Sequence, residues 1–186
     1  MSSRIWTIGH STREIKIFIS LLEGNGIKLV ADVRRLPGSK RYPQFNRDAL
    51  AASLNERGMA YEHFPELGGR RKPKPDSHNT SWRNPSFRGY ADYMETEEFR
   101  KAVKRLVDLA RRIGPVAIMC AEAVWWRCHR ALIADYLKAR GVEVIHIVDL
   151  AKTEEHPFTS AAQMVDGELN YEANDSLLSQ AWRYLF

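Results

Sequence analysis

Both cysteines of the chain lie in one short stretch, residues 119–130 (MCAEAVWWRCHR). The stretch also contains a glutamate, a histidine and two arginines, so it combines nucleophilic, acid–base and anion-binding groups. A cysteine close to arginines and to a helix N-terminus has a lowered thiol pKa, which suits nucleophilic or redox chemistry. Cys120 or Cys128 is therefore a candidate nucleophile, while the competing interpretation is that of an ordinary buried thiol.

The same stretch offers metal-ligand atoms, and His10 offers another. The spacing of Cys120, Glu122, Cys128 and His129 matches no common zinc pattern. On an α-helix, neighbouring residues point about 100° apart, so we expect Cys128 and His129 not to face one ion. We expect no metal and no cofactor, and we keep zinc binding or reversible thiol oxidation as alternatives.

The elements that must position these groups follow from the hydrophobic pattern. Short apolar runs alternate with amphipathic stretches, which predicts a Rossmann-like α/β fold: a three-layer open sheet of about five mainly parallel strands with helices on both faces. The predicted strands are 4–9, 27–33, 59–64, 115–120 and 142–148. Helices are predicted over 14–24, after Asn46, after Thr96 and over 127–140.

Two segments depart from this alternation. Residues 65–89 form a Pro/Gly-rich stretch with six Arg or Lys against two acids, and we expect a loop there that is either functional or disordered. We assign residues 1–150, with this loop, to the α/β core domain, and residues 151–186 to a C-terminal extension packed on the same domain. The extension is expected to contain a short strand around 169–171 and a last helix with Trp182, Tyr184 and Phe186.

Composition limits the class of protein. An apolar fraction of 44% and a charged fraction of 27% are typical of a globular chain. No apolar run approaches the ~18 residues of a membrane span, and the N-terminal sequence becomes polar too early for a signal peptide. We therefore expect a cytoplasmic protein without a membrane partner. A net charge of +5 favours anionic partners.

Ligands of open parallel sheets bind outside the carboxyl ends of the strands, and the unusual polar residues of this chain follow predicted strands. They are His10, Ser11, Thr12 and Arg13 after the first strand, Asp32 and Arg34 after the second, Gly69 and Arg70 after the third, and Cys120, Glu122, Arg127, Cys128, His129 and Arg130 after the fourth. Cys120, Cys128, Glu122, Asp32 and His10 are the candidate catalytic groups, and the others are candidate substrate-binding residues.

Two alternatives stay open for these residues. Asp32 and Glu122 form either an acid–base pair or salt bridges with Arg34 and Arg130. Basic residues in the predicted first turn of the helix over 127–140 oppose its dipole. Either a bound anion resolves this conflict, or the helix begins one turn later.

Several blocks of the chain resemble a known family. TIGHSTR, LVADVRRLPGS, LGGRR, FRGYADYM, MCAE and CHRALIADYL occur in order between about Trp6 and Val148. They resemble the signature blocks of the bacterial and archaeal family called domain of unknown function 488. The resemblance implies that the candidates named above, except Thr12 and Arg127, are family motif positions, and it adds Tyr90 to the substrate-binding set. It implies no particular reaction. Where family members often have a proline, this chain has Trp125 and Trp126.

The sequence therefore favours an enzyme, a transferase or hydrolase, that acts on a phosphate-bearing small molecule, a nucleotide or a nucleic acid. One alternative is a nucleic-acid-binding module without catalysis, in which the 65–89 loop and Trp82, Trp125 and Trp126 contact phosphates and bases. The other is a metal- or redox-active cysteine protein. The sequence predicts no oligomeric state.

Overall fold

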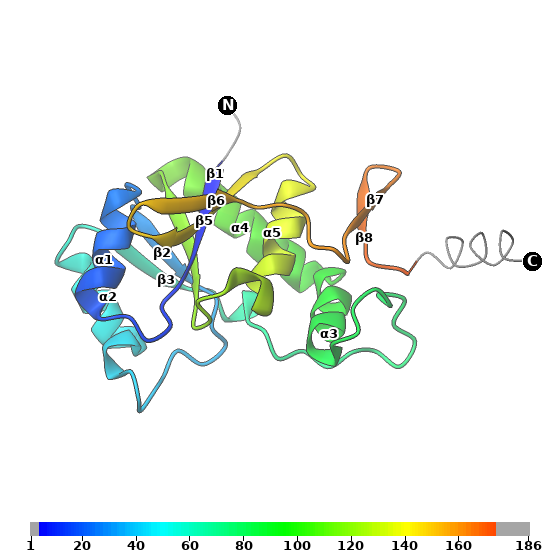
Figure 1. Ribbon diagram of the computed structural model, residues 1–186, viewed down its shortest axis with the longest axis horizontal. Coiled ribbons are helices and arrows are strands. Elements are labelled where there is room, and N and C mark those ends of the chain that lie inside the picture. Colours follow the sequence, from blue (N-terminus) through cyan, green and yellow to red (C-terminus); the bar gives the residue numbers. More distant parts are fainter. Residues whose placement is uncertain (1–3, 174–186) are drawn as a thin grey trace, which may run out of the picture.

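The computed structural model describes residues 4–173. Its main sheet has six strands in the order β3-β2-β4-β1-β5-β6 (Figure 1). These are β1 (Arg4–Gly9), β2 (Leu29–Asp32), β3 (Ala60–His63), β4 (Val116–Cys120), β5 (Glu143–Asp149) and β6 (Lys152–Glu155). The first five strands are parallel and β6 is antiparallel to β5. The predicted fold class is confirmed.

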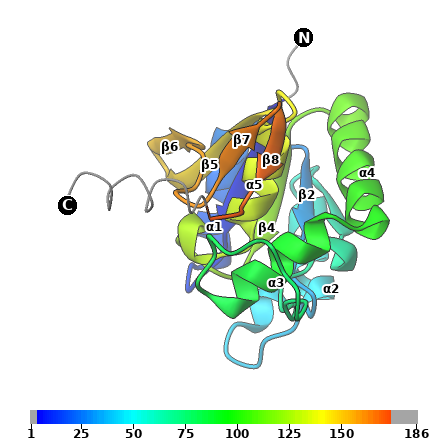
Figure 2. The same ribbon diagram turned by 90° about the vertical axis from the view of Figure 1, so that its right-hand side faces the viewer.

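Helices cover both faces of this sheet, as Figures 1 and 2 show. On one face, α1 (Ile15–Gly24) and α2 (Arg47–Asn55) pack against alternate strand residues such as Val30 and Met119. On the other face, α3 (Pro85–Met94), α4 (Glu97–Ile113) and α5 (Arg130–Lys138) pack against residues such as Ile118. Because both faces are covered, every residue of β4 is buried.

The ends of three strands lie level with one another. Gly9 of β1 is opposite Cys120 of β4, and Asp32 of β2 is opposite Met119 of β4. The connection after β1 passes through α1 on one face, whereas the connection after β4 passes through α5 on the other face. A crevice at such a point is the usual ligand site of an open parallel sheet.

Local sequence signals explain where α4 begins and ends. The hydroxyl of Thr96 accepts a hydrogen bond from the backbone N–H of Phe99 at 3.3 Å. Glu97 and Glu98 occupy the first turn, and Arg111 and Arg112 occupy the last, where each charge opposes that of the helix end. The predicted N-cap at Thr96 is thus confirmed.

The predicted start of the helix over 127–140 was wrong. Residues Trp125–Arg127 form a short 3-10 turn, η3, and α5 begins only at Arg130. Cys128 between them has an extended backbone, with φ −126° and ψ 148°. The alternative of a helix that begins a turn later therefore holds, and Arg127 and His129 lie ahead of its first turn.

The Pro/Gly-rich segment 65–89 is more ordered than an open loop. It begins with a 3-10 turn, η2 (Pro65–Leu67), and its last residues open α3 at Pro85. The side chain of Asn84 caps α3 by accepting the N–H of Ser86 at 2.8 Å. The middle of the segment is fastened by Asp92, which accepts hydrogen bonds from Lys74 N, Ser77 Oγ and Asn79 Nδ2.

Residues 151–173 contain more strand than the sequence predicts. β6 extends the main sheet, and β7 (Gln163–Val165) pairs with β8 (Glu168–Asn170) in a hairpin that includes the strand expected around 169–171. Figure 1 shows this hairpin and α3 at the same end of the molecule. The expected helix with Trp182, Tyr184 and Phe186 lies outside the described residues.

The segment after β6 is attached to α5 through one buried carboxylate. Asp135 of α5 accepts hydrogen bonds from the backbone and hydroxyl of Thr159, at 2.9 and 2.6 Å, and from the hydroxyl of Tyr171 at 2.8 Å. His156 Nε2 lies 3.0 Å from the same carboxylate. His156 also lies 2.9 Å from His146 of β5, so one polar network joins helix, sheet and segment.

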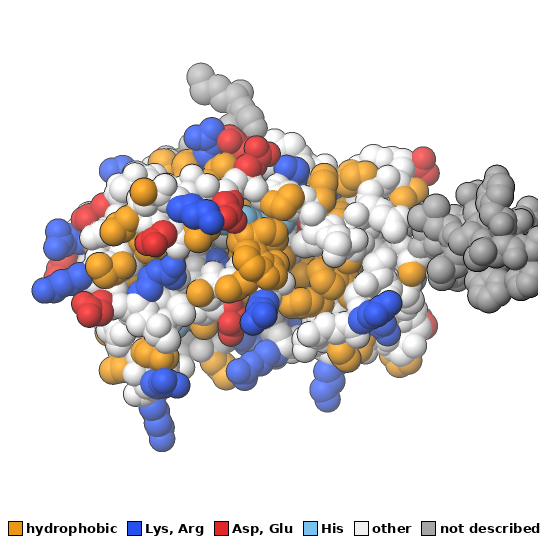
Figure 3. Space-filling model, in the orientation of Figure 1, with side chains coloured by type: hydrophobic (Ala, Val, Ile, Leu, Met, Phe, Trp, Pro, Cys, Tyr) orange, Lys and Arg blue, Asp and Glu red, His pale blue; other side chains and the backbone are white. Residues whose placement is uncertain are grey.

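Among residues 4–173, no helix combines the length and apolar character needed to cross a lipid bilayer. On the face drawn in Figure 3, acidic and basic side chains are mixed, while Lys and Arg predominate along the lower margin.

Candidate active site

A cleft of about 480 Å³ opens at the carboxyl ends of β1, β2 and β4. Nine of the residues predicted from the sequence line it: His10, Arg34, Gly69, Arg70, Cys120, Glu122, Arg127, Cys128 and His129. The other lining residues are Arg35, Leu36, Gly38, Ser39, Ser86, Phe87 and Ala121. The convergence predicted from the strand ends thus appears as one cavity.

Asp32 lies beneath this cleft as the partner of a buried arginine. Its carboxylate accepts hydrogen bonds from Arg34 Nε at 2.9 Å, from Arg34 Nη2 at 2.6 Å and from the hydroxyl of Tyr61 at 2.7 Å. Asp32 is fully buried and Arg34 is 7% exposed. Of the two alternatives for Asp32, the geometry favours the salt bridge over the acid–base pair with Glu122.

His10 lines the cleft as a neutral imidazole. Burial lowers its pKa to about 4, and the neighbouring guanidinium of Arg34 acts in the same direction. Nδ1 lies 2.9 Å from the carbonyl of Ser11, which can only accept, so Nδ1 carries the proton. Nε2 then accepts from Arg34 Nη1 at 3.3 Å, and the ring stacks on Phe45 at 4.3 Å between centroids.

The two cysteines and His129 form a compact cluster at the wall of the cleft. One ligand atom from each of Cys120, Cys128 and His129 lies within 4.8 Å of the other two. Cys128 Sγ is 3.6 Å from His129 Nδ1. The expectation that Cys128 and His129 point apart was wrong, because Cys128 is extended and the helix begins only after His129.

The thiols of this cluster differ in acidity. A hydrogen bond to Cys128 and then burial raise the pKa of Cys120 well above its ordinary value. The hydrogen bond from Cys120, and next the contact with His129, lower the pKa of Cys128 against the opposing effect of burial. Both shifts come mainly from the hydrogen bond between the two thiols, in which Cys120 donates to Cys128.

The His129 ring is held by close packing. A Cβ added to Gly69 would lie 2.9 Å from His129 Nδ1, so the backbone approaches the ring as only glycine permits. Tyr90 packs on the ring at 5.1 Å between centroids, and its hydroxyl donates to the carbonyl of Leu67 at 2.8 Å. Tyr90 is fully buried and therefore positions His129 from behind the cleft wall.

Two predicted arginines are part of the framework. Arg130, only 1% exposed, donates to the carbonyl of Glu122 and lies 3.4 Å from the hydroxyl of Thr7. Arg13 donates to the carbonyl of Gly9 and, at 2.8 Å, to that of Val148. The backbone carbonyl of Glu122 therefore accepts a hydrogen bond from Arg130, whereas the residue itself is exposed and lines the cleft. Ser11 and Thr12, which follow β1, are not among the lining residues.

Sequence reasoning missed part of the cleft. Ser86 and Phe87 come from the first turn of α3, which was hidden inside the expected loop. Arg35 and Ser39 come from the loop after β2, within a block already quoted for the family resemblance. They could have been predicted from their position shortly after Arg34, which the sequence already places at the carboxyl edge of the sheet.

Three arginines of the cleft keep unpaired charges. None of the ion pairs found between residues 4 and 173 involves Arg35, Arg70 or Arg127. All three residues are exposed. Arg35 Nη1 lies 3.4 Å from the carbonyl of Arg70, which brings the loops after β2 and β3 together. The cleft therefore has an anion-attracting rim.

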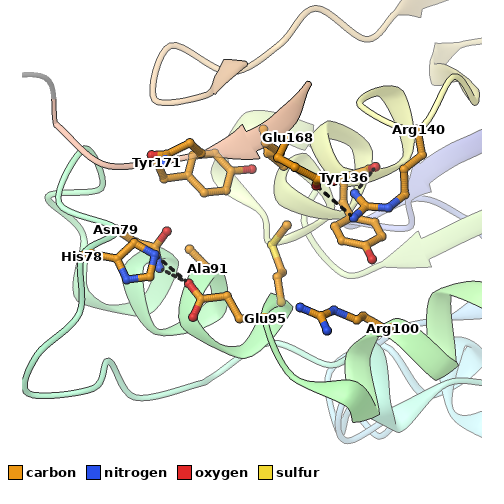
Figure 4. Close-up of a pocket in the computed structure, with 12 residues that line it drawn as sticks. His78, Asn79, Ala91, Glu95, Arg100, Tyr136, Arg140, Glu168 and Tyr171 are labelled. Atoms are coloured by element: carbon orange, nitrogen blue, oxygen red, sulfur yellow. Dashed lines mark hydrogen bonds and ion pairs between the residues drawn. The ribbon is translucent and has the colours of Figure 1, made fainter. Parts of the chain in front are cut away.

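A second, smaller cavity of about 160 Å³ lies between α3, α5 and the β7–β8 hairpin (Figure 4). Its charged groups are largely paired with one another: Glu95 with His78 at 3.1 Å, and Arg140 with Glu168 at 3.7 Å. Figure 4 shows these pairs on opposite sides of the cavity. The pairing fits a role in attaching the hairpin, and it leaves few groups for a ligand.

The fold and the cleft define an α/β protein with a cysteine–histidine cluster beside an arginine rim, at the carboxyl edge of a mainly parallel sheet. The chain belongs to the family described as Domain of unknown function DUF488, whose model matches residues 14–137. The match confirms the resemblance predicted from the sequence blocks. No curated protein and no solved structure matches the chain.

Proposed function

We propose that this protein is an enzyme, a hydrolase or transferase, that binds a phosphate-bearing or nucleotide substrate in the cleft and reacts with it at the cysteine–histidine cluster. The observation that carries the proposal is the shared cavity. Cys120, Cys128 and His129 line the same cleft of about 480 Å³ as the unpaired guanidinium groups of Arg35 and Arg70. Reactive groups and anion-binding groups would thus face the same bound molecule.

The rim supplies the binding energy. Guanidinium groups form paired, charge-assisted hydrogen bonds with phosphate oxygens. Arg35, Arg70 and Arg127 come from three different loops, so an anion between them would be held from several sides. Arg34 is a weaker candidate for direct contact because its charge is neutralised by Asp32.

The wall of the cleft supplies the reacting groups. The exposed Glu122 is available to take a proton or to bind a sugar hydroxyl. His10, held neutral with its Nε2 toward Arg34, orders the floor of the cleft. The thiol cluster is the reactive centre, so single replacement of Cys120 or Cys128 by serine should abolish turnover and leave substrate binding largely intact. Full activity in both serine variants would contradict this role.

Ligand binding is the direct test of the arginine rim. Inorganic phosphate, nucleoside monophosphates and nucleoside diphosphates should be screened by thermal shift and then titrated by calorimetry. Arg70→Ala or Arg127→Ala should weaken the phosphate ligand about tenfold to a hundredfold, the value of a lost charge-assisted hydrogen bond. Arg112→Ala is the matched control, because Arg112 is exposed on α4 close to where β4 begins, at the opposite edge of the sheet. A panel without any stabilising ligand, or equal binding by all variants, would refute the proposal.

A second candidate function is binding of nucleic acid without catalysis. Trp126, which precedes Arg127 of the cleft rim, is 55% exposed and could stack on a base. Trp125 is stacked on His146 at 4.3 Å, and Trp82 packs edge-on against Phe87 at 5.0 Å, so both are occupied within the protein. This function predicts an affinity for single strands that falls steeply with salt. Salt-insensitive binding, or none, would exclude it.

We propose a cytoplasmic location for this activity. Two free thiols whose sulfurs lie within 4.8 Å of each other persist best in a reducing compartment. Fractionation of cells that express the chain with an epitope tag would test the location.

A further inference from the structure

Three potential metal-ligand atoms, two sulfurs and one imidazole nitrogen, already lie close together in this protein. The atoms of Cys120, Cys128 and His129 are all within 4.8 Å of one another, and the Cys128 sulfur is 3.6 Å from His129 Nδ1. Tetrahedral zinc, with bonds of about 2.3 Å to sulfur and about 2.0 Å to nitrogen, holds such atoms about 3.5–3.8 Å apart. Shifts of about 1 Å or less would complete that geometry.

The types of ligand atom select the metal. Two thiolates and an imidazole suit zinc, whereas magnesium and calcium prefer carboxylate and carbonyl oxygens. The cluster found among residues 4–173 contains no carboxylate. Two thiolates would also balance the charge of a divalent ion at a site that lies beside Arg130.

His129 presents its Nδ1 to the thiol of Cys128. Its Nδ1 contacts only the thiol of Cys128 among the hydrogen bonds found in residues 4–173, and its Nε2 is buried without any partner there. Zinc bound at Nδ1 would leave Nε2 without a partner, so Nδ1 is the nitrogen that carries the inference. Meanwhile Gly69 and Tyr90 hold the ring in place, as a metal ligand requires.

The position of the cluster indicates an open site. Cys120, Cys128 and His129 all line the cleft, and the group has three members in the described part of the chain. Three protein ligands and one free position are typical of catalytic zinc, whereas structural zinc has four protein ligands. The free position would face the space in which the arginine rim holds an anion.

We infer that Cys120, Cys128 and His129 bind one zinc ion whose fourth position is open to the cleft. This inference rests on the proposed function, because the ion would act on the substrate that is held in the same cleft. It changes the role of the cysteines, which become metal ligands. The fourth position would hold either a water, which zinc would make more acidic, or an oxygen of the substrate's phosphoryl group, whose phosphorus zinc would make more electrophilic.

Cobalt is the probe, because Co²⁺ replaces zinc and reports its ligands by colour. The full, reduced chain should be titrated with Co²⁺ without oxygen. We expect thiolate-to-cobalt charge-transfer absorption and intense visible bands of a tetrahedral site, saturating at one equivalent and bleached by Zn²⁺. Both thiols should become protected from a thiol reagent.

Variants assign the ligands. Cys120→Ser, Cys128→Ser and His129→Ala should each weaken Co²⁺ binding by more than about a hundredfold, beyond the effect of outer-shell changes. His78→Ala, at an exposed histidine outside the cleft, should bind as the parent does. If a ligand variant fails to fold by circular dichroism, Gly69→Ala keeps all three ligands and should still weaken binding.

The outcomes separate this inference from the proposed function. The zinc site is refuted if the reduced chain shows no cobalt spectrum and both thiols stay reactive. It is also refuted if the two thiols form a disulfide and the chain binds no Co²⁺ after that disulfide is reduced. Phosphate titration of Arg70→Ala decides the proposed function separately. A cobalt spectrum with no response to any phosphate ligand would leave the metal site standing and remove the substrate class.

Discussion

The buried ion pair of Asp32 and Arg34 gives the sharpest prediction for stability. Asp32 is fully buried, Arg34 is 7% exposed, and their closest atoms are 2.6 Å apart. Asp32→Asn keeps the shape of the side chain but leaves the guanidinium without its counter-charge. Removal of one partner from a buried pair costs about 3–5 kcal/mol. For a chain of this size, that loss corresponds to a fall in melting temperature of about 10 °C.

Urea unfolding at neutral pH, followed by circular dichroism, measures this loss. The matched control is Glu23→Gln, which removes an exposed partner of Arg57 at 3.7 Å and should cost less than ~0.5 kcal/mol. The double variant Asp32→Leu with Arg34→Met removes both charges and should recover part of the loss. If Asp32→Asn lowers the free energy of unfolding by less than ~1 kcal/mol, the ion pair does not stabilise the floor of the cleft and the prediction is refuted.

Two further predictions concern single positions. Gly69→Ala should cost ~1–3 kcal/mol by displacing the His129 ring, whereas Gly38→Ala, in the same cleft with nothing within 4 Å of the added carbon, should match the parent in urea unfolding. Burial, followed by the charges of His156 and Arg130, lowers the pKa of His146 to about 3 from 6.5. The unfolded chain therefore binds the extra proton between these values, and stability is lost as the pH falls below about 6.5. Between pH 6.5 and 5, His146→Gln should therefore lose ~2 kcal/mol less free energy of unfolding than the parent. Parallel curves of stability against pH for the parent and the variant would contradict this prediction.

The sheet could be predicted because its strands carry their own signals. Apolar runs such as VAIMC at 116–120 are buried on both faces, and each one is followed by polar residues that the parallel arrangement brings to one edge. β6 could not be predicted in this way. Its sequence, KTEE, has no apolar pattern, because it is an edge strand whose existence depends on pairing with β5.

The residues of the cleft could be predicted better than their geometry. Which way Cys128 and His129 face depends on a helix boundary, and a shift of three residues turned two diverging side chains into neighbours. Basic residues at the expected start of the helix opposed its dipole, and that conflict was the available sign of a later start. The start of α3 lies within the segment expected to be a loop, although a proline such as Pro85 is favourable in the first turn of a helix.

The hydrogen bonds of Asp135 bear on how this protein can be shortened. The family match ends at residue 137 and therefore includes Asp135, while Thr159 and Tyr171, which donate to it, lie beyond the match. A shortened chain that stops at residue 150 would look reasonable from the family boundary alone. Such a chain would leave the buried carboxylate of Asp135 without its hydrogen-bond donors Thr159 and Tyr171. Water would then enter to solvate the carboxylate and would disturb α5, the helix that begins immediately after His129. In this chain, the minimal unit for expression or for grafting the site onto another protein thus extends at least to Tyr171.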